Sequence, residues 1–199
     1  HLFLRNFSSS TMTKRIALFA SGSGSNAENI IRYFSDNCDF SFPVIISNNE
    51  NAFVHERAKK MGVPSITFSR EDFIEGKKIL NFLQEKRIDA IVLAGFLLKI
   101  PDLIIEAYPR KIINIHPALL PKFGGKGMYG MKVHSAVLEA GEKETGITIH
   151  YVNSNYDEGD IIFQAKCPVL SGDTPESVAQ RVHALEYEYF PRIIAEIWN

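Results

Sequence analysis

The stretch RIALFASGSGSN, residues 15–26, decides how the rest of the chain is interpreted. Residues 16–20 form an unbroken apolar run, which is typical of a strand buried on both faces of a parallel sheet. The serine-glycine turn that follows leads directly into residues 27–34, where apolar side chains recur on one helical face. A strand, a glycine-rich turn and a helix together form the first βα unit of a doubly wound fold.

The same alternation continues along the chain. Apolar strands are predicted at residues 43–47, 63–68, 89–96 and 111–115, and helices at 52–61, 69–86 and 98–107. Strands that alternate with helices indicate a mainly parallel sheet with right-handed crossovers. Towards the C-terminus the pattern changes to two strands joined by a short acidic turn and a long last helix, expected at residues 145–152, 161–169 and 175–198.

The alternating side chains of residues 145–152 are typical of a half-buried strand, and the short turn after it predicts an antiparallel pair. The expected fold is therefore α/β: a doubly wound, Rossmann-like, mainly parallel sheet with an antiparallel edge strand near the C-terminal end. The length of 199 residues fits one substantial core. We expect one domain over residues 14–199, after a disordered extension over residues 1–13.

The composition is that of an ordinary globular protein, with 45% hydrophobic residues, 23% charged residues and a formal net charge of −1 at pH 7. The sequence has no basic stripe and no apolar run long enough to cross a membrane, so neither nucleic acid nor membrane is an expected partner. Cys38 and Cys167 are far apart and belong to no C-x-x-C pair, which favours a reducing, cytoplasmic location. The protein is expected to be a monomer or a homodimer.

The turn at residues 21–26 is suited to bind a phosphate group. Glycines let the backbone approach a ligand, and the following helix offers unpaired N–H groups with a partial positive charge. Gly22, Gly24 and Ala27 also match a dinucleotide fingerprint, with Glu50 as the nearby acid that could hold a ribose. Phosphate binding is the preferred interpretation, and an NAD site or a purely structural turn are the alternatives.

A second polar feature follows the strand at residues 111–115. Asn114 and His116 lie two positions apart, so their side chains point to the same side of the strand. Pro117 ends the strand and keeps His116 extended at its mouth. An amide beside an imidazole can stabilise an oxyanion while a proton moves at the same centre. The alternative is a strand that merely has a polar end.

Residues 114–123, NIHPALLPKF, closely resemble the signature of the folate-dependent formyltransferases. Further matching motifs are residues 21–26, Leu93–Phe96, Thr145–Tyr151 and Tyr156–Gly159, and the resemblance extends from about residue 14 to residue 198. The family uses 10-formyltetrahydrofolate as a cosubstrate and needs no metal. The chain is most similar to the branch that formylates glycinamide ribonucleotide in purine biosynthesis, so small-molecule substrates are expected.

The resemblance also implies roles for individual residues. The catalytic set would be Asn114, His116 and Asp157. The ribonucleotide would be bound by Gly24, Ser25, Asn26, His183 and Glu186, and the folate by Arg70, Leu97, Leu98, Lys99, Ile100 and Asn114. The chain departs from the family pattern in two places. Residues 97–99 lack an arginine that is common in the family, and the loop at residues 123–131 is longer and richer in glycine. This loop either becomes ordered over the substrate or is merely long.

The expected mechanism is attack of an amine on the formyl carbon. Asn114 and a protonated His116 would stabilise the oxyanion, and Asp157 would raise the pKa of His116 and orient its ring. His150 is either a partner of this set or a structural histidine, and His134 is expected at the surface. No nucleophilic serine or cysteine is required.

Three other functions share parts of this pattern. Methionyl-tRNA formyltransferase would add a C-terminal domain and a basic surface for tRNA. Formyltetrahydrofolate hydrolase would add an N-terminal regulatory domain. A non-catalytic nucleotide-binding module would need the turn at residues 21–26 but would have no use for Asn114, His116 and Asp157 together.

Overall fold

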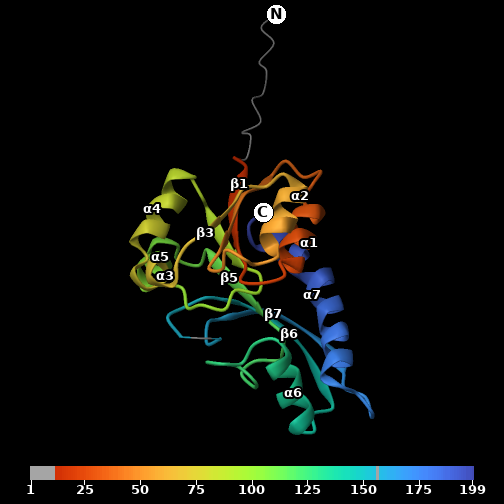
Figure 1. The fold of residues 1–199 in the computed structure, drawn as a ribbon. Coiled ribbons are helices and arrows are strands. Elements are labelled where there is room, and N and C mark those ends of the chain that lie inside the picture. The colour runs from red at the N-terminus through yellow and green to blue at the C-terminus, as the bar shows by residue number, and fades with distance from the viewer. Residues whose placement is uncertain (1–11, 156) are drawn as a thin grey trace, which may run out of the picture.

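The computed structural model describes residues 12–155 and 157–199. Its strands form one seven-stranded sheet in the order β3-β2-β1-β4-β5-β6-β7 (Figure 1). Their bounds are β1 Lys14–Phe19, β2 Phe40–Ser47, β3 Ser65–Thr67, β4 Ala90–Leu93, β5 Ile112–His116, β6 Glu144–Tyr151 and β7 Ile161–Pro168. The first five strands are parallel, and β6 is antiparallel to both β5 and β7. The predicted fold class is confirmed. Residues 1–11 of the expected extension lie outside the described residues.

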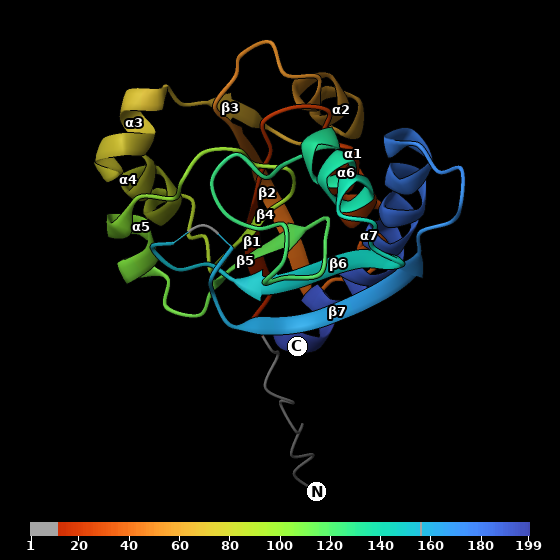
Figure 2. The same ribbon diagram turned by 90° about the horizontal axis from the view of Figure 1, so that it is seen from below.

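Helices cover both faces of the sheet (Figure 2). On one face are α1 Ser25–Tyr33, α2 Val54–Met61 and α7 Pro175–Ile197, and on the other are α3 Arg70–Glu75, α4 Lys77–Glu85 and α5 Asp102–Ala107. Strand β1 contributes to both cores: Ile16 and Leu18 pack towards α1, α2 and α7, whereas Ala17 and Phe19 pack towards α3, α4 and α5. This explains why the sequence of β1 is apolar without alternation.

The order of the strands reverses beside β1. The chain runs from β1 outward to β2 and β3, and then returns to place β4 and β5 on the other side of β1. The turns after β1 and β4 therefore diverge at the carboxyl ends of adjacent strands, where open α/β sheets bind their ligands. The N–H of Leu97, after β4, donates to the hydroxyl of Ser21, after β1, at 2.9 Å and joins these two turns.

Strand β6 differs from its prediction because it is buried along nearly its whole length rather than on one face. Ile147 and Ile149 lie in the core beneath α7. On the opposite face, the hydroxyl of Thr148 donates to the carbonyl of Ala118 at 2.7 Å and accepts from the N–H of Leu120 at 3.0 Å. The chain after β5 thus covers the face that alternation assigned to solvent.

Two predicted helices also have different bounds. The helix expected over residues 69–86 is divided into α3 and α4 by Gly76, whose φ of 80° is left-handed. The helix expected from residue 98 begins only at Asp102, because Pro101 disfavours a helical conformation for Ile100. At the starts of α3 and α7, Ser69 and Thr174 each form a capping box.

Helix α6, Met131–Glu139, packs against α7 beside the antiparallel strands. Among the described residues, no helix is both long and apolar enough to span a bilayer.

Candidate active site

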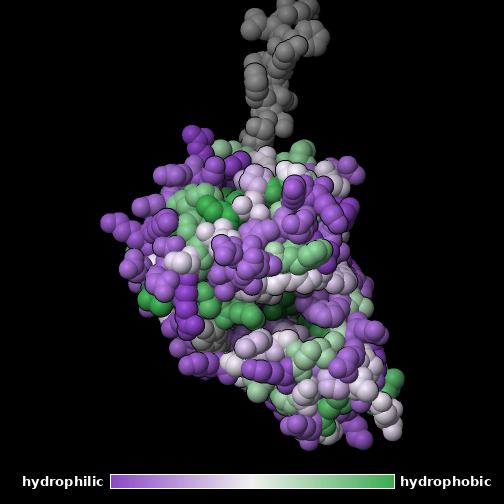
Figure 3. Space-filling view, viewed as in Figure 1, coloured by the Kyte–Doolittle hydropathy of each residue, from purple (hydrophilic) through white to green (hydrophobic). Residues whose placement is uncertain are grey.

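A hollow crosses the face of the molecule shown in Figure 3, between the parallel strands and the region of β6 and α6. It is a cavity of about 780 Å³, a size common for sites that bind small organic ligands. Every residue to which the family resemblance assigns a role lines this cavity: Gly24, Ser25, Asn26, Arg70, Leu97, Leu98, Lys99, Ile100, Asn114, His116, Asp157, His183 and Glu186. Residues from six separate segments of the sequence thus meet in one place.

One end of the cavity is formed by the turn between β1 and α1. Gly24 precedes α1 with a left-handed φ of 75°, and a Cβ at this position would lie 2.3 Å from Cγ2 of Val54. Only glycine fits at this position. Helix α1 begins without a side chain that caps its first N–H groups. These groups are therefore free to bind an anion.

A buried carboxylate lies beside this turn. Glu186 on α7 is 5% exposed, and its two oxygens accept hydrogen bonds from Nδ2 of Asn26 at 2.6 Å and from Nδ1 of His183 at 2.9 Å. The bond to Glu186 is the largest cause of the raised pKa of His183. The cluster joins α7 to α1 and presents both donors and acceptors to the cavity.

Arg57 on α2 forms hydrogen bonds to the same turn. Its Nε donates to the carbonyl of Ser23 at 2.7 Å, Nη2 donates to the Ser23 hydroxyl at 3.3 Å, and Nη1 is paired with Glu28 at 2.6 Å. No local sequence pattern marks this residue, because helix α2 is brought to the turn only by the fold.

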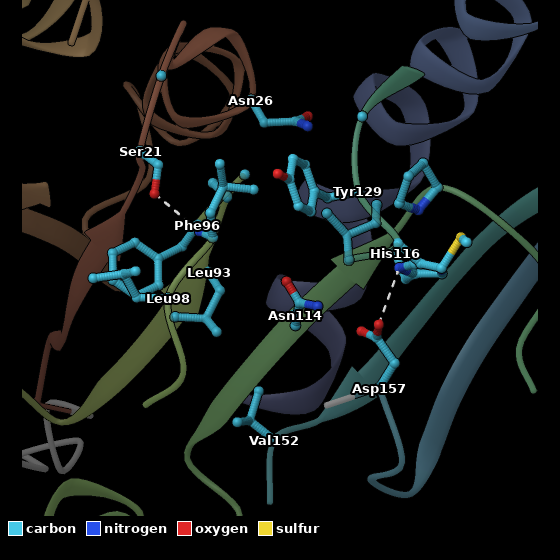
Figure 4. Close-up of a pocket in the computed structure, with 18 of the residues that line it drawn as sticks. Ser21, Asn26, Leu93, Phe96, Leu98, Asn114, His116, Tyr129, Val152 and Asp157 are labelled. Atoms are coloured by element: carbon cyan, nitrogen blue, oxygen red, sulfur yellow. Dashed lines mark hydrogen bonds and ion pairs between the residues drawn. The ribbon is translucent and has the colours of Figure 1, made fainter. Parts of the chain in front are cut away.

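The centre of the cavity contains the predicted catalytic set (Figure 4). Asn114 and His116 point to the same side of β5, as predicted, and Asp157 approaches His116 from the turn after β6. Nδ1 of His116 lies 3.5 Å from Oδ2 of Asp157, and its Nε2 donates to the carbonyl of Phe123 at 2.7 Å. The backbone N–H of Gly125 donates to Oδ2 of Asp157 at 3.1 Å. The glycine-rich loop therefore contacts both His116 and Asp157.

His150 on β6 completes this set. It is directly opposite Asn114 in the pairing of β5 with β6, and Nδ2 of Asn114 donates to Nε2 of His150 at 3.2 Å. Nε2 also lies 3.5 Å from Oδ1 of Asp157, while Nδ1 donates to the carbonyl of Tyr151 at 2.9 Å. Of the two sequence interpretations of His150, the structure supports a partner of the set. It links Asn114 to Asp157.

The pKa shifts correct one expectation. Burial lowers the pKa of His116, and this effect outweighs the opposing effect of the Asp157 charge and the Phe123 carbonyl. The predicted effect of Asp157, which raises the pKa of His116, is confirmed, but burial outweighs it, so the expectation of a protonated His116 was wrong. Burial alone would raise the pKa of Asp157, but contact with His150, the nearby His116 and the Gly125 N–H together lower it. The set thus favours a neutral imidazole beside an ionised carboxylate.

The other end of the cavity is more apolar. Leu93, Phe96, Leu98 and Val152 line it (Figure 4), and Arg70 is one of the cations at this end, as the first residue of α3. Leu97–Ile100 form a segment without regular secondary structure here, because the expected helix does not begin until Asp102. Such a surface suits a flat, partly apolar ligand with an acidic group.

Two further cavity residues, one within the glycine-rich loop and one after it, had no assigned role in the sequence interpretation. Tyr129 lies across the cavity from Ser21 (Figure 4), and His134 on α6 lines the cavity as well. The expectation that His134 lies at the surface was wrong: it is 2% exposed, because α6 packs against α7. The signal for these residues was only their position near the NIHP motif. Within the described ranges, no group of three or more His, Cys, Asp or Glu side chains is arranged to hold a metal ion.

Known proteins resemble this chain in sequence and in fold. It is 38% identical over 190 residues to phosphoribosylglycinamide formyltransferase, chloroplastic, of Arabidopsis thaliana, covering 92% of this chain and 65% of that protein. It is 38% identical over 190 residues to phosphoribosylglycinamide formyltransferase of Bacillus subtilis, covering 92% of this chain and 94% of that one. The crystal structure of phosphoribosylglycinamide formyltransferase from Anaplasma phagocytophilum is similar with a TM-score of 0.85 and 35% identity, covering 94% of this chain and 87% of that chain.

The chain spans less than two thirds of the length of the Arabidopsis protein but nearly the whole of the Bacillus protein. The sequence pattern that defines the formyl transferase family matches residues 14–194, which include every strand and all but the last turn of α7. The chain therefore belongs to the formyl transferase family.

Proposed function

We propose that this protein is a phosphoribosylglycinamide formyltransferase, which transfers the formyl group of 10-formyltetrahydrofolate to the amine of glycinamide ribonucleotide in purine biosynthesis. The observation that carries the proposal is the position of Asn114, His116 and Asp157 between two chemically different ends of one cavity. The end formed by Gly24, Ser25 and α1 suits a phosphate. The apolar end near Leu97–Ile100 and Arg70 suits a pterin with an acidic tail.

Binding would place the two reacting groups beside β5. Backbone N–H groups at Ser25 and Asn26 would bind the phosphate, while Glu186 and His183 would bind the ribose. The folate would lie along Leu97–Ile100 with its formyl group at Asn114. Holding the amine and the formyl carbon together in this way converts a bimolecular encounter into a step within one complex.

The amine nitrogen then attacks the formyl carbon, and the electron pair of the C=O bond moves to oxygen. One N–H of Asn114 is bonded to His150, and the other would stabilise the oxyanion. A single donor of this kind contributes about 10²–10³-fold to the rate in comparable sites.

His116 would act as the proton carrier. Because burial lowers its pKa, the ring is neutral near pH 7, with Nε2–H bonded to Phe123 and the Nδ1 lone pair available. Nδ1 would take the proton that the attacking amine loses, and the Asp157 carboxylate would stabilise the imidazolium. When the C–N bond to the folate breaks, the proton passes to the departing folate nitrogen, which yields tetrahydrofolate and the formylated ribonucleotide.

The test is the absorbance change as 10-formyltetrahydrofolate becomes tetrahydrofolate, with and without glycinamide ribonucleotide. We expect turnover that requires the ribonucleotide and that falls about 10²–10⁴-fold in Asp157→Asn. Asp160→Asn is the matched control, because this carboxylate lies three residues further along, has an 81% exposed side chain and does not line the cavity. Deformylation without any acceptor would instead indicate a hydrolase. Equal turnover in the two variants would overturn the catalytic role of Asp157.

The cytoplasmic location and the monomeric or homodimeric state that the sequence suggests stay predictions. Sedimentation of the purified protein, alone and with ribonucleotide, tests the second of them.

A further inference from the structure

His134 is a buried histidine that the proposed mechanism does not use. The residue is 2% exposed, and its Nδ1 is buried without a hydrogen-bond partner among the described residues. Leaving a buried polar atom unpaired is costly, and most such atoms in folded proteins are paired. A histidine that only filled space between α6 and α7 would serve less well than leucine or phenylalanine. Its position is therefore expected to have another use.

The surroundings of His134 indicate that use. It lines the cavity together with Asn26, His183 and Glu186, the residues at the end that we assign to the ribonucleotide. Burial and then the neighbouring His183 lower the pKa of His134, although Glu186 opposes them, so the ring is neutral at pH 7. A neutral imidazole carries one N–H.

The proton belongs on Nε2. An unpaired buried N–H is rarer in proteins than an unpaired acceptor, so the buried Nδ1 is better left as a lone pair. Nε2 makes no hydrogen bond with the described residues and is not among the buried atoms that lack a partner. Because His134 lines the cavity, Nε2 is the nitrogen that can offer an N–H donor there.

We propose that Nε2–H of His134 donates a hydrogen bond to an oxygen of the phosphoribosyl group of the substrate. The inference rests on the proposed function and adds a binding residue to it. Glu186 can only accept hydrogen bonds, whereas a ribose hydroxyl can donate to Glu186 and accept from His134 at the same time. A phosphate oxygen would also accept from His134. The shared chemistry is an oxygen acceptor on the sugar phosphate.

Three variants test this inference. His134→Phe keeps a ring in the same space and removes the donor, and His134→Gln restores an N–H at a similar reach. Val137→Ala is the packing control, because Val137 is 1% exposed one turn further along α6 and does not line the cavity. If His134→Phe does not fold, His134→Leu removes the donor in the same way.

We expect His134→Phe to raise the KM for glycinamide ribonucleotide about tenfold, with kcat and the KM for 10-formyltetrahydrofolate unchanged. His134→Gln should recover most of the affinity. Val137→Ala should lower the melting temperature without changing either KM. Unchanged affinity for the ribonucleotide in a folded His134→Phe protein would overturn the inference.

Calorimetry with ribose 5-phosphate and with inorganic phosphate supplies a readout that does not depend on turnover. Weaker binding of both compounds to His134→Phe would assign the contact to phosphate, and weaker binding of ribose 5-phosphate alone would assign it to a ribose oxygen. Equal binding of ribose 5-phosphate to both proteins would contradict the inference. A wild-type protein that does not formylate the ribonucleotide, but whose binding of ribose 5-phosphate depends on His134, would refute the proposed function and retain the inference.

Discussion

The carbonyl oxygen of Phe123 lies 2.7 Å from Nε2 of His116 and accepts its hydrogen bond. Phe123 has a left-handed φ of 58°, which is uncommon for a residue with a side chain. The loop thereby selects the tautomer of His116 and leaves Nδ1 facing Asp157. A backbone group outside the NIHP motif thus controls the orientation of the His116 ring.

This contact predicts opposite effects for two substitutions of Phe123. Glycine adopts a left-handed conformation freely, so Phe123→Gly should keep the carbonyl in place and retain kcat within about twofold. Valine is strained there by about 1–2 kcal/mol, so Phe123→Val should displace the carbonyl and lower kcat about tenfold. Steady-state kinetics at saturating substrates measures both. Equal rates for the two variants would show that the carbonyl does not orient His116.

The lowered pKa of His116 predicts the pH dependence of the reaction. The acceptor of the amine proton must be neutral, and burial shifts its titration below the ordinary value of 6.5. Activity should therefore be constant above pH 6.5 as far as His116 is concerned, and should fall only as the pH decreases below that value. A plot of log kcat/KM between pH 5 and pH 8 measures the midpoint. A midpoint above pH 6.5 would favour a cationic His116 instead.

The same shift has a consequence for stability. The folded state binds the His116 proton more weakly than the unfolded state, so the free energy of unfolding should rise with pH until about pH 6.5. Asp157, whose pKa is lowered, contributes stability above its ordinary value of 3.8, and this contribution is lost as the pH falls through the folded-state pKa. Urea unfolding of wild type and His116→Gln at pH 5.5 and 7.5 tests the first effect. The variant should show the smaller difference between the two pH values.

His150 should be important for rate rather than for binding. Because it links Asn114 to Asp157, His150→Phe would leave Asp157 without one of the contacts that keep it ionised. We expect kcat to fall about ten- to a hundredfold, and the apparent pKa of Asp157 to rise. His55→Phe serves as a comparison, since His55 bonds to Ser65 and does not line the cavity. A loss confined to KM would refute the prediction.

Arg57 offers a test of the turn at residues 21–26. Arg57→Ala removes the two hydrogen bonds to Ser23, so the KM for glycinamide ribonucleotide should rise about tenfold while kcat stays constant. Arg57→Lys should recover part of this loss. Arg32→Ala is the matched control, because Arg32 pairs with the same Glu28 but has a 69% exposed side chain and makes no contact with the turn. A similar KM in both alanine variants would contradict the role of Arg57.

The features that the sequence predicted well are local ones. An apolar run followed by a glycine turn is enough to recognise β1 and α1, and the two-residue period of a strand is enough to place Asn114 and His116 on one side. The prediction of a catalytic function for Asn114 and His116 depended on the family resemblance, because an amide and an imidazole at the end of a strand are common. Residues 98–101 were misjudged because their apolar pattern resembles a helix, although Pro101 prevents one.

The features that sequence analysis missed depend on contacts between distant segments. His150 faces Asn114 only through the register of β5 with β6, which no local pattern specifies. His134 is buried because α6 packs against α7, and its helix alone would have left it exposed to solvent. Arg57 reaches Ser23 from a helix that follows a different strand. These contacts depend on how the strands and helices are arranged in space, so the sequence alone could not predict them.

The hydrogen bond between Asn26 and Glu186 also affects when the site can exist during synthesis. A nascent chain can form β1, the turn and α1 early, since these elements are consecutive. The carboxylate that accepts from Asn26 emerges from the ribosome only with α7, which follows all seven strands in the sequence. A chain interrupted before α7 would therefore have the turn at residues 21–26 but not Glu186, which accepts the hydrogen bond of Asn26.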